Sequence, residues 1–258
     1  MTKEKPGDNV RAVDRALDIL MAFTVADARL TATDLLKKVD LSRPTLYRLL
    51  YTLEQSGFLV AEGDPQRFRL GPSVAHLAHV WTASLDVAAL AQPMLRRMWE
   101  ASLETVAMFV PQGGDRLCVA ELASMQPLSF KRGVGYKERL ALGASGRAIL
   151  AFSNYDRAMI EGLITGLDTT YEDYEKELEA TRRRGYAISL EELIAGAVAV
   201  AAPFFNGAGQ PVGSIAMFGP RVRMDDARIA ELVPLLIEEA ANMSKALGSR
   251  PPSAVQGA

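Results

Sequence analysis

Five side chains that donate hydrogen bonds lie close together near the amino terminus. They are Ser42, Arg43, Thr45, Tyr47 and Arg48. An arginine guanidinium can donate two parallel hydrogen bonds to a guanine edge, and hydroxyl groups suit phosphate oxygens. The same stretch carries leucines spaced three, four and seven residues apart, which is typical of one buried helix face. The pattern therefore predicts a helix that buries its leucines and presents its donors to duplex DNA.

The segments around this cluster have the order of a winged helix-turn-helix domain. One helix is predicted to start near Asn9, and its apolar stripe comprises Val10, Val13, Leu17 and Leu20. A second helix is predicted over 31–38, and a third, over 42–57, carries the donors and ends at a glycine. The apolar runs 58–60 and 67–70 flank a turn and predict a two-stranded hairpin. Three short helices followed by such a hairpin are typical of DNA-binding domains.

Three more donors are placed by these elements where a duplex could reach them. Thr31 is the expected N-cap of the second helix. Arg67 and Arg69 alternate with apolar residues, so they share one strand face, as a wing along a phosphate backbone would need. We therefore expect DNA contacts from Thr31, Ser42, Arg43, Thr45, Tyr47, Arg48, Arg67 and Arg69. The alternative is a solvated arginine face without DNA, and the charge of residues 1–72, 11 − 10 = +1, does not decide between the two.

Length and composition fit a globular protein of one large domain or two. The chain has 258 residues, of which 49% are hydrophobic and 23% charged, so disorder over most of its length is excluded. A formal net charge of −2 argues against a generally basic nucleic-acid coat, while a local basic patch stays open. The single cysteine, Cys118, cannot form an internal disulfide. The first nine residues lack the apolar run of a signal peptide, and we expect a cytoplasmic protein.

One long uncharged stretch, 193–220, could suggest a membrane segment. Its apolar part, 193–205, has 13 residues, fewer than the roughly 20 that a spanning helix needs. The turn-forming residues 206–211 then interrupt it. Two buried strands joined by a turn fit this pattern better, and we expect no membrane partner.

From Gly71 onward the sequence predicts a larger domain of strands and helices. A long helix is expected to start at Ser73 and to carry an apolar stripe that includes Trp81 and Leu85, with Pro93 ending it and opening the next helix. Strands are predicted over 105–110, 116–122, 127–131, 197–205 and 212–218. Further helices are predicted over 145–152, 156–163, 171–184 and 225–247. Strands interleaved with helices indicate an α/β or α+β domain.

Several segments together resemble the IclR family of bacterial transcriptional regulators. They are NVRAVDRALDILMAF, LTATDLLKKVDLSRPTLYRLLYTLEQSGFLV, FRLG, LALGASGRAILAF and RRRGYAISLEELIAGAVAVAAPFFNGAGQPVGSIAMFGP. They agree with the family in order and spacing over about 9–248. The resemblance implies an α+β protein with a winged helix-turn-helix DNA-binding domain over 9–71 and a linker helix over 72–91. A GAF-like or profilin-like α/β effector-binding domain would follow over 92–248, with a flexible tail over 249–258.

The resemblance also implies partners. A homodimer or homotetramer would bind a pseudo-palindromic operator in double-stranded DNA, with two recognition helices about one helical turn of DNA apart. Dimerisation would largely use the DNA-binding half and the linker helix. The apolar stripe with Trp81 and Leu85 agrees with a partner at the linker, although packing on its own domain explains the stripe equally well.

In this family, small organic acids bind above the sheet of the effector domain. Carried over by position, the effector-binding residues here are Gly143, Ala144, Ser189, Ala199, Ala216 and Phe218. Backbone amides at a helix start could hold a carboxylate, although an ordinary helix cap would show the same sequence. Some relatives carry an acidic residue, a cysteine and serines at these places, so we expect an effector with a substantial apolar or aromatic part and at most one anionic group. The pocket walls, or the core, could include Met108, Phe109, Leu128 and Phe130.

Enzyme and metal chemistry find little support in the sequence. Residues 143–147 read Gly-Ala-Ser-Gly-Arg and lack the last glycine of a nucleophile elbow. The two histidines, His76 and His79, have no acidic or cysteine neighbours to complete a metal site, and 133–135 lacks the third glycine of a dinucleotide site. We therefore expect no catalytic residue, no metal and no cofactor. The main alternative is a small-molecule-binding module with a helical protein-interaction head that binds no DNA.

Overall fold

The computed structural model divides the chain into two compact units, Met1–Leu85 and Asp86–Ala258. The described residues are 10–24, 26–84 and 86–249, without the side chains of 78, 79 and 81–84. The predicted flexible tail, apart from Ser249, therefore lies outside the described residues, and so do the side chains of Trp81 and Leu85 in the predicted linker stripe.

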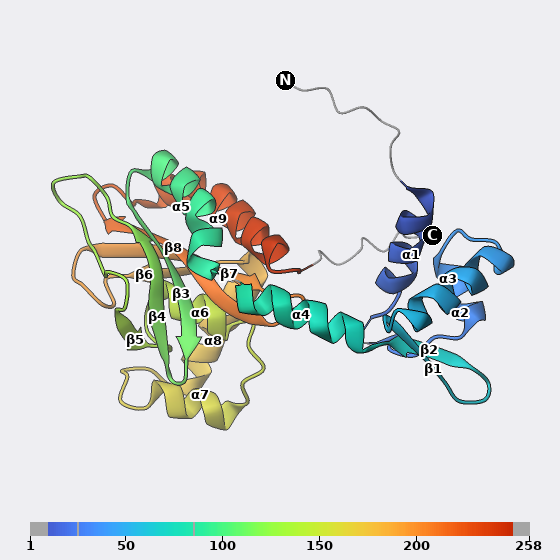
Figure 1. Ribbon diagram of the computed structural model, residues 1–258. Helices are drawn as coiled ribbons and strands as arrows, with labels where there is room; N and C mark the ends of the chain where they lie inside the picture. The colour runs from blue at the N-terminus through green and yellow to red at the C-terminus, as the bar shows by residue number, and fades with distance from the viewer. Residues whose placement is uncertain (1–9, 25, 85, 250–258) are drawn as a thin grey trace, which may run out of the picture. The chain divides into compact units, whose positions relative to one another are not determined.

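The first unit is a small helical bundle with a two-stranded wing (Figure 1). Its elements are α1 (Arg11–Met21), α2 (Ala32–Lys38), α3 (Arg43–Gln55), β1 (Leu59–Glu62), β2 (Arg67–Leu70) and α4 (Pro72–Ser84). The hairpin is antiparallel and pairs Leu59 with Leu70 and Glu62 with Arg67. The winged helix-turn-helix predicted for this part of the chain is confirmed.

Local sequence signals explain where the helices of this unit begin and end. Thr31 and Asp34 form a capping box at the start of α2. Pro44 lies in the first turn of α3, where the N–H that proline lacks would have no helical partner anyway. After α3 the chain turns at Gly57 with φ +71°, a left-handed conformation that glycine adopts without steric cost.

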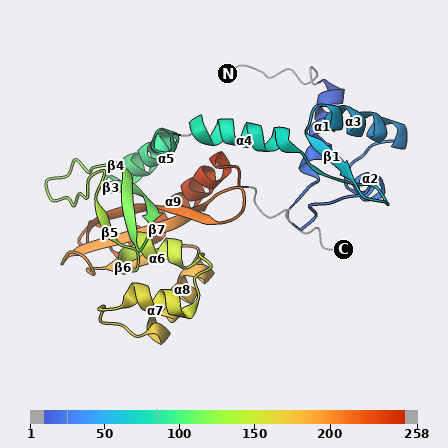
Figure 2. The same ribbon diagram turned by 60° about the horizontal axis from the view of Figure 1, so that its bottom comes forward.

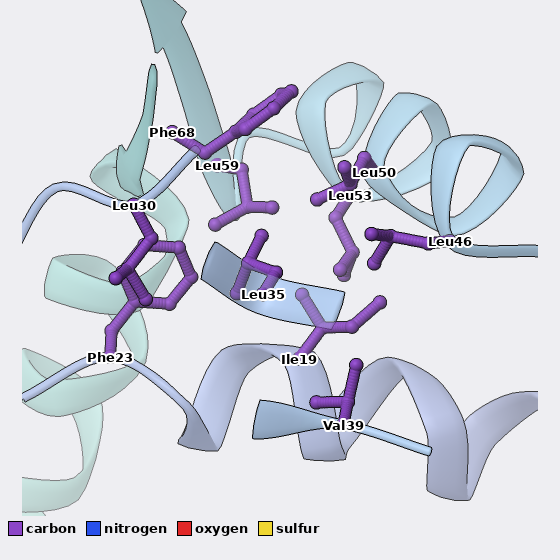
Figure 3. Packing of buried hydrophobic residues seen from close by; sticks show 10 residues of the cluster. All are labelled: Ile19, Phe23, Leu30, Leu35, Val39, Leu46, Leu50, Leu53, Leu59 and Phe68. Carbon is purple, nitrogen blue, oxygen red and sulfur yellow. The ribbon is translucent and has the colours of Figure 1, made fainter. Parts of the chain in front are cut away.

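Ten buried side chains form the core of the first unit (Figure 3). They are Ile19, Phe23, Leu30, Leu35, Val39, Leu46, Leu50, Leu53, Leu59 and Phe68. Helix α3 contributes three leucines at spacings of four and three residues, which keeps them on one helix face. Phe68 points inward between two outward arginines, and its backbone pairs with Leu30, so the wing is tied to the bundle.

Helix α1 has two apolar faces. Its core face carries Ile19, which is fully buried. Three of the four residues in the predicted stripe lie outside this core: Val10, Val13 and Leu17 expose 65%, 54% and 52% of their surface, while Leu20 packs against the core. Met21, which was not in the predicted stripe, exposes 54%. These four residues, Val10, Val13, Leu17 and Met21, are named the α1 stripe here. Spacing identifies such a stripe but does not say whether it faces the chain's own core or a partner.

Among the described residues, the second unit is built on a six-stranded sheet in the order β5-β4-β3-β8-β7-β6, with antiparallel neighbours throughout. The strands are β3 (Thr105–Gln112), β4 (Asp115–Leu122), β5 (Lys137–Arg139), β6 (Ala187–Leu190), β7 (Ala197–Phe205) and β8 (Pro211–Pro220). The helices are α5 (Val87–Ser102), α6 (Gly143–Leu150), α7 (Arg157–Ile164), α8 (Tyr171–Arg184) and α9 (Asp226–Ala246). The predicted mixture of strands and helices is therefore confirmed.

Helices cover both faces of this sheet. Figures 1 and 2 show α5 and α9 on one face and α6 on the other, with α7 and α8 beyond α6. The central strand β3 is buried on both sides, and alternate residues face opposite helices. Ala107 and Phe109 belong to the face under α6, where they pack with Ala144 and Ala148. Small alanines dominate this face, which lets α6 approach the sheet closely.

The linker region differs from the single helix expected over 72–91. Helix α4 ends at Ser84, and α5 begins at Val87 with Asp86 as its N-cap, whose carboxylate accepts the N–H of Ala89 at 3.0 Å. Pro93, which was expected to break the helix, lies inside α5. The cap at Asp86 starts the new helix before the proline, and proline removes only one backbone hydrogen bond from a helix that is packed in the core.

The edges of the sheet also differ from the prediction. Residues 127–131, expected as a strand, form a loop whose backbone bonds to side chains: the carbonyl of Phe130 accepts the Thr105 hydroxyl at 2.7 Å. The next N–H groups, of Arg132 and Gly133, donate to the Glu121 carboxylate. Sequence patterning does not reveal the edge strands β5 and β6, because three or four residues are too few for a period.

The remaining helices and strands agree with the predicted ranges to within two residues at each end. The uncharged stretch 193–220 includes β7 and β8, which pair with each other in the sheet. None of the helices in the described part of the chain combines the length and apolarity of a membrane span.

Candidate nucleic-acid interface and ligand pocket

Helix α3 exposes the donors that were selected from the sequence. Arg43, Tyr47 and Arg48 are exposed, and Tyr47 keeps 52% of its surface accessible. Thr45 is half-buried, and its hydroxyl lies 2.9 Å from that of Ser42 at the helix start. Because the leucines of α3 occupy the opposite, buried face, the donors form one polar face near the N-terminal end of the helix.

The two arginines of this face keep their donors available. The salt bridges described in the first unit join other residues, namely Arg29 to Glu62, Lys37 to Asp34, Lys38 to Asp27 and Arg69 to Glu62. An arginine without a carboxylate partner can offer its planar fork of N–H groups to a base or a phosphate. Tyr51, one turn beyond Tyr47 and 65% exposed, extends the face and was not among the predicted contacts.

Thr31 lies at the start of α2, and its side chain is engaged in the capping box. The hydroxyl accepts the N–H of Asp34 at 3.1 Å and donates to the carboxylate of Asp34 at 2.7 Å. The Asp34 carboxylate accepts hydrogen bonds from the hydroxyl and, at 3.1 Å, from the backbone N–H of Thr31, and these two bonds hold the pKa of Asp34 below its ordinary value. The structure therefore gives Thr31 a helix-capping role, and a DNA contact by Thr31 stays a prediction.

The two arginines predicted for the wing differ in solvent exposure and in pairing. Arg67 is exposed, whereas Arg69 is half-buried and donates from Nε to Glu62 at 3.1 Å. Phe68 between them is buried, so the period-two alternation expected for this strand is present. Glu62 also binds Arg29 at 3.1 Å, and Arg29 is an exposed cation beside the wing that the sequence analysis did not single out.

An apolar groove runs along the first unit between α1, α3 and α4. Its apolar lining comes from Val13, Leu17, Leu20, Leu49, Leu53, Phe58 and Leu77. Arg48 and Thr45 form part of its edge. The groove continues the α1 stripe, and Leu77 on α4 exposes 53% of its surface. An isolated monomer of this unit would therefore expose one contiguous apolar surface to water.

The second unit has a pocket between α6 and the sheet. Its lining residues are Phe109, Arg116, Phe130, Arg132, Gly143, Ala144, Ser145, Ser189, Glu192, Leu193, Ile194, Ala197, Val198, Ala199, Ala216 and Phe218. All six residues predicted for effector binding are among them, although they lie up to 75 positions apart in the chain. Phe109 and Phe130 line the pocket as well. Leu128 is 55% exposed and Met108 is fully buried, and neither is part of the lining.

The start of α6 is held close to the pocket by tight backbone packing. Gly143 has φ +72°, and its N–H donates to the carboxylate of Glu192 at 3.1 Å. A Cβ on Gly146 would lie 1.8 Å from the carbonyl oxygen of Leu140, so only glycine allows this approach. Ala144 and Ser145 line the pocket, and their N–H groups, in the first turn of α6, have no acceptor within the helix.

A buried ion pair fixes one side of the pocket. Both Nη atoms of Arg147 bind the carboxylate of Glu192, at 2.6 and 2.5 Å, and Arg147 also donates to the carbonyl of Ile188. Burial opposes the charge of Glu192, but the hydrogen bonds from Arg147, Gly143 and Ser189 outweigh it and leave the pKa of Glu192 below its ordinary value. This pair neutralises its own charge and orients α6 against β6.

The sequence analysis missed the charged residues of the pocket: Arg116, Arg132 and Glu192. The sequence does contain a signal for Arg116: it occupies every second position of β4 together with Cys118 and Ala120, and all three are buried. Cys118 itself is buried, which raises the pKa of its thiol to about 12. Residues 86–249 and the other described parts contain no cluster of three or more metal-ligating side chains.

Two family models match this chain. The model described as the IclR helix-turn-helix domain matches residues 12–63, and the model of the bacterial transcriptional regulator IclR C-terminal domain matches residues 79–245. Together they cover the donor-bearing helix and the pocket. The chain belongs to the IclR family of bacterial transcriptional regulators.

Full-length relatives support the same assignment. This IclR-family chain is 29% identical over 248 residues to the HTH-type transcriptional regulator BhcR of Paracoccus denitrificans, covering 93% of this chain and 88% of BhcR. It is 26% identical to the HTH-type transcriptional repressor AllR of Escherichia coli, covering 92% and 90% of the two chains. These relatives, and the proteins that the two family models describe, are transcriptional regulators and not enzymes.

Solved IclR-type structures share the fold. A regulator from a Silicibacter species matches with a TM-score of 0.82 at 23% identity, covering 94% of this chain and 98% of that one. The repressor BlcR of Agobacterium tumefaciens matches with a TM-score of 0.73 at 25% identity, covering 95% and 100%. The order of a winged helix-turn-helix followed by a mixed α and β domain is therefore that of the family.

Proposed function

We propose that this IclR-family regulator binds a pseudo-palindromic operator as a homodimer or homotetramer and changes its affinity for DNA when a small organic acid binds the second unit. The observation that carries the proposal is the exposed face of α3, where Arg43, Tyr47 and Arg48 stand free while the leucines are buried. The major groove admits an α-helix whose N-terminal residues reach base edges. The DNA-binding domain of this proposal spans 9–71, and the effector domain spans 92–248.

The base-reading and phosphate-binding roles follow from geometry and chemistry. Arg43 and Arg48 are the candidates for bidentate contacts with guanine, and Ser42, Thr45 and Tyr47 are candidates for phosphate contacts. On the wing, Arg67 is the stronger phosphate ligand, because Arg69 would have to leave Glu62 to reach DNA. Thr31 would contribute mainly through the start of α2.

The apolar surface of the first unit supports self-association. The α1 stripe and the neighbouring groove are exposed in the chain by itself, and burying a side chain such as Leu17 contributes about 1.5–3 kcal/mol. A two-fold dimer through this surface would hold two copies of α3 at a fixed separation. Such a pair would read two inverted half-sites about one helical turn of DNA apart.

In this proposal, binding of the acid to the second unit is linked thermodynamically to binding of DNA by the first. An effector that favours one arrangement of the paired DNA-binding units over another shifts the population toward that arrangement. The shift in DNA affinity is limited by the difference in effector affinity between the two arrangements. The pocket of the second unit, with aromatic walls and cationic groups, suits a small organic acid, and aromatic acids are among the candidates.

Binding to DNA from the regions upstream of the protein's own gene and neighbouring genes tests the proposal. The affinity is measured by electrophoretic mobility shift over a series of salt concentrations, with and without a panel of organic acids. Phosphate contacts predict that log K falls with log salt at a slope of about −0.9 per neutralised phosphate. Binding that ignores salt, or no binding at low salt, would instead favour a protein-interaction role for the helical unit.

A further inference from the structure

Arg116 on β4 is a buried cation that no carboxylate pairs with in the described part of the chain. Only 3% of its surface is exposed. Its Nη1 donates to the carbonyl of Arg139 at 2.5 Å, while Nε is buried and has no acceptor among the described residues. Arg147 is almost as buried, and its Nε also lacks an acceptor, but unlike Arg116 it forms a bidentate pair with the carboxylate of Glu192. A buried arginine with unused donors is costly unless a further group neutralises it.

The free side of this guanidinium lies at the pocket beside the start of α6. Arg116 lines the pocket, and its Nη2 is so close to α6 that a Cβ on Gly143 would lie 3.4 Å from it. Ala144 and Ser145, whose first-turn N–H groups have no acceptor within α6, line the same pocket. A guanidinium and a helix start that share one cavity form an arrangement suited to a single carboxylate.

The other charges around the pocket leave this place open for one anion. Both Nη atoms of Arg147 are already bound to Glu192, so this pair offers little attraction to a second carboxylate on its side. Arg132 stacks on Tyr136 with its guanidinium carbon 5.0 Å from the ring centre, and Tyr136 donates to Glu138 at 2.7 Å. Burial outweighs the attraction of Glu138 and lowers the pKa of Arg116 to about 10, so Arg116 is still charged at neutral pH.

The remaining walls are apolar and aromatic. Phe109, Phe130 and Phe218 line the pocket, and Ala199 and Ala216 provide a floor of small side chains. The guanidinium carbon of Arg116 lies 5.6 Å from the ring centre of Phe109, so the cation and the aromatic wall meet at one place. An aromatic ring held by such walls gains from ring–ring contacts in addition to burial.

We propose that Arg116 and the first turn of α6 bind the carboxylate of an aryl monocarboxylic acid whose ring lies among Phe109, Phe130 and Phe218. This inference rests on the proposed function, which makes the pocket the effector site, and adds the residue that holds the acid group and the chemical class of the acid. A short acid without a ring would fill the cation site but leave the aromatic walls in contact with water. A second carboxylate would meet Glu192.

Isothermal titration calorimetry on the full chain tests this assignment without DNA. The probes are benzoate, phenylacetate and 3-phenylpropanoate, each with its uncharged carboxamide, and acetate and pyruvate as short acids. The unaltered protein is expected to bind at least one aryl acid at least tenfold more tightly than the matching carboxamide and the short acids. Equal affinity for acid and carboxamide, or binding of short acids only, or of no aryl acid, would overturn the assignment.

Variants locate the charge that the acid recognises. Arg116→Met is expected to weaken binding of the aryl acid at least tenfold and to leave the affinity for the carboxamide within twofold. Arg157→Met, which removes an exposed arginine of α7 outside the pocket, is the matched control and is expected to bind the acid like the unaltered protein. Undiminished acid binding by Arg116→Met would overturn the proposal. The comparison of acid with carboxamide on the unaltered protein needs no variant and decides the case if Arg116→Met does not fold.

DNA binding separates this inference from the proposed function. Operator affinity of the unaltered protein and of the control Arg157→Met is measured without any acid and is expected to be equal. If the unaltered protein binds no DNA, the proposed function fails, whatever the calorimetry shows. If it binds DNA and the acid panel behaves against expectation, only the assignment of Arg116 and of the aryl acid fails.

Discussion

At the scale of single residues, arginine side chains differ in role because their surroundings differ. Arg43 and Arg48 are exposed on α3, where they can leave water for a base edge. Arg147 is buried and paired, and therefore fixes structure. Arg116 is buried and has no carboxylate partner among the described residues, which is why we propose it as a ligand for an acid. A count of basic residues does not distinguish these roles, and burial and pairing do.

Substitution of the exposed α3 arginines tests base reading. Arg43→Ala or Arg48→Ala is expected to weaken operator binding by about 1–3 kcal/mol if the side chain reads a guanine, and to relax sequence preference at that position. The measurement is fluorescence anisotropy with operator and single-base variants of it. Arg157→Ala, an exposed arginine of the second unit, is the control. Unaltered affinity in both α3 variants would exclude α3 as the reading helix.

Removal of the Arg116 charge is also expected to change stability. Replacing a buried unpaired cation by an apolar side chain of similar length can stabilise a fold. In the absence of acid, Arg116→Met is therefore expected to raise the melting temperature by roughly 2–4 °C, which corresponds to about 1 kcal/mol in a chain of this size. Differential scanning calorimetry gives the value. A marked fall would indicate that the bond from Arg116 to the carbonyl of Arg139 matters more than the desolvation of the charge.

At the scale of elements, the second unit is held together by a link between α5 and α9. Glu239 on α9 is buried and receives hydrogen bonds from Arg97 on α5 at 2.5 and 2.6 Å and from Asn242 at 3.1 Å. Burial would raise the pKa of Glu239, but these hydrogen bonds outweigh it and hold the pKa below its ordinary value. A carboxyl whose folded pKa is lowered stabilises the fold above its unfolded pKa and loses that contribution as the pH falls through the folded value.

The pH dependence of this link can be measured with Glu239→Gln. At about pH 7 the variant is expected to lose about 1.5–3 kcal/mol of unfolding free energy, the range for hydrogen bonds to a charged group. Below the folded pKa the difference is expected to vanish, because protonated Glu239 is then neutral like glutamine. Urea unfolding is followed by the fluorescence of Trp99, which lies on α5, in a Trp81→Phe background. A difference that does not change with pH would contradict the charge-based explanation.

The exposed stripe of helix α1 leads to a prediction about self-association of the chain. Leu17→Glu places a charge in the exposed α1 stripe and is expected to convert a dimer into a monomer, with little effect on the fold, because Leu17 is already 52% exposed. Light scattering coupled to size-exclusion chromatography gives the mass. Val222→Glu, at a residue 81% exposed in the second unit, is the control and should leave the mass unchanged. An unchanged mass in Leu17→Glu would place the self-association surface elsewhere.

Much of the fold follows from the sequence because its local signals are strong. The leucine spacing of α3 and the turn at Gly57 determine that helix to within two residues. Pro93 misleads, because the cap at Asp86 and core packing decide where α5 begins. The pocket residues are distant in sequence and were found only by resemblance. Arg116 was missed because a charged strand residue is normally taken to face water, although it shares the buried face of β4 with Cys118 and Ala120.

At the scale of the whole molecule, one chain carries two candidate sites. The first unit has the exposed donor face of α3 and an apolar surface, and the second has a pocket with a cation at its wall. If the acid and the DNA are linked, the acid changes DNA affinity by the factor by which DNA changes acid affinity. Couplings of this kind typically amount to about 1–3 kcal/mol.

The most direct test is hydroxyl-radical footprinting of the purified protein on DNA from upstream of its own and neighbouring genes, with the Arg48→Ala variant in parallel. The account predicts two protected, inverted half-sites about one helical turn apart, approximately 10 base pairs, and loss of protection in the variant. A footprint without two-fold symmetry, or no footprint at low salt, would contradict the claim that paired α3 helices read the operator. Full protection by both single variants, Arg48→Ala and Arg43→Ala, would contradict it as well.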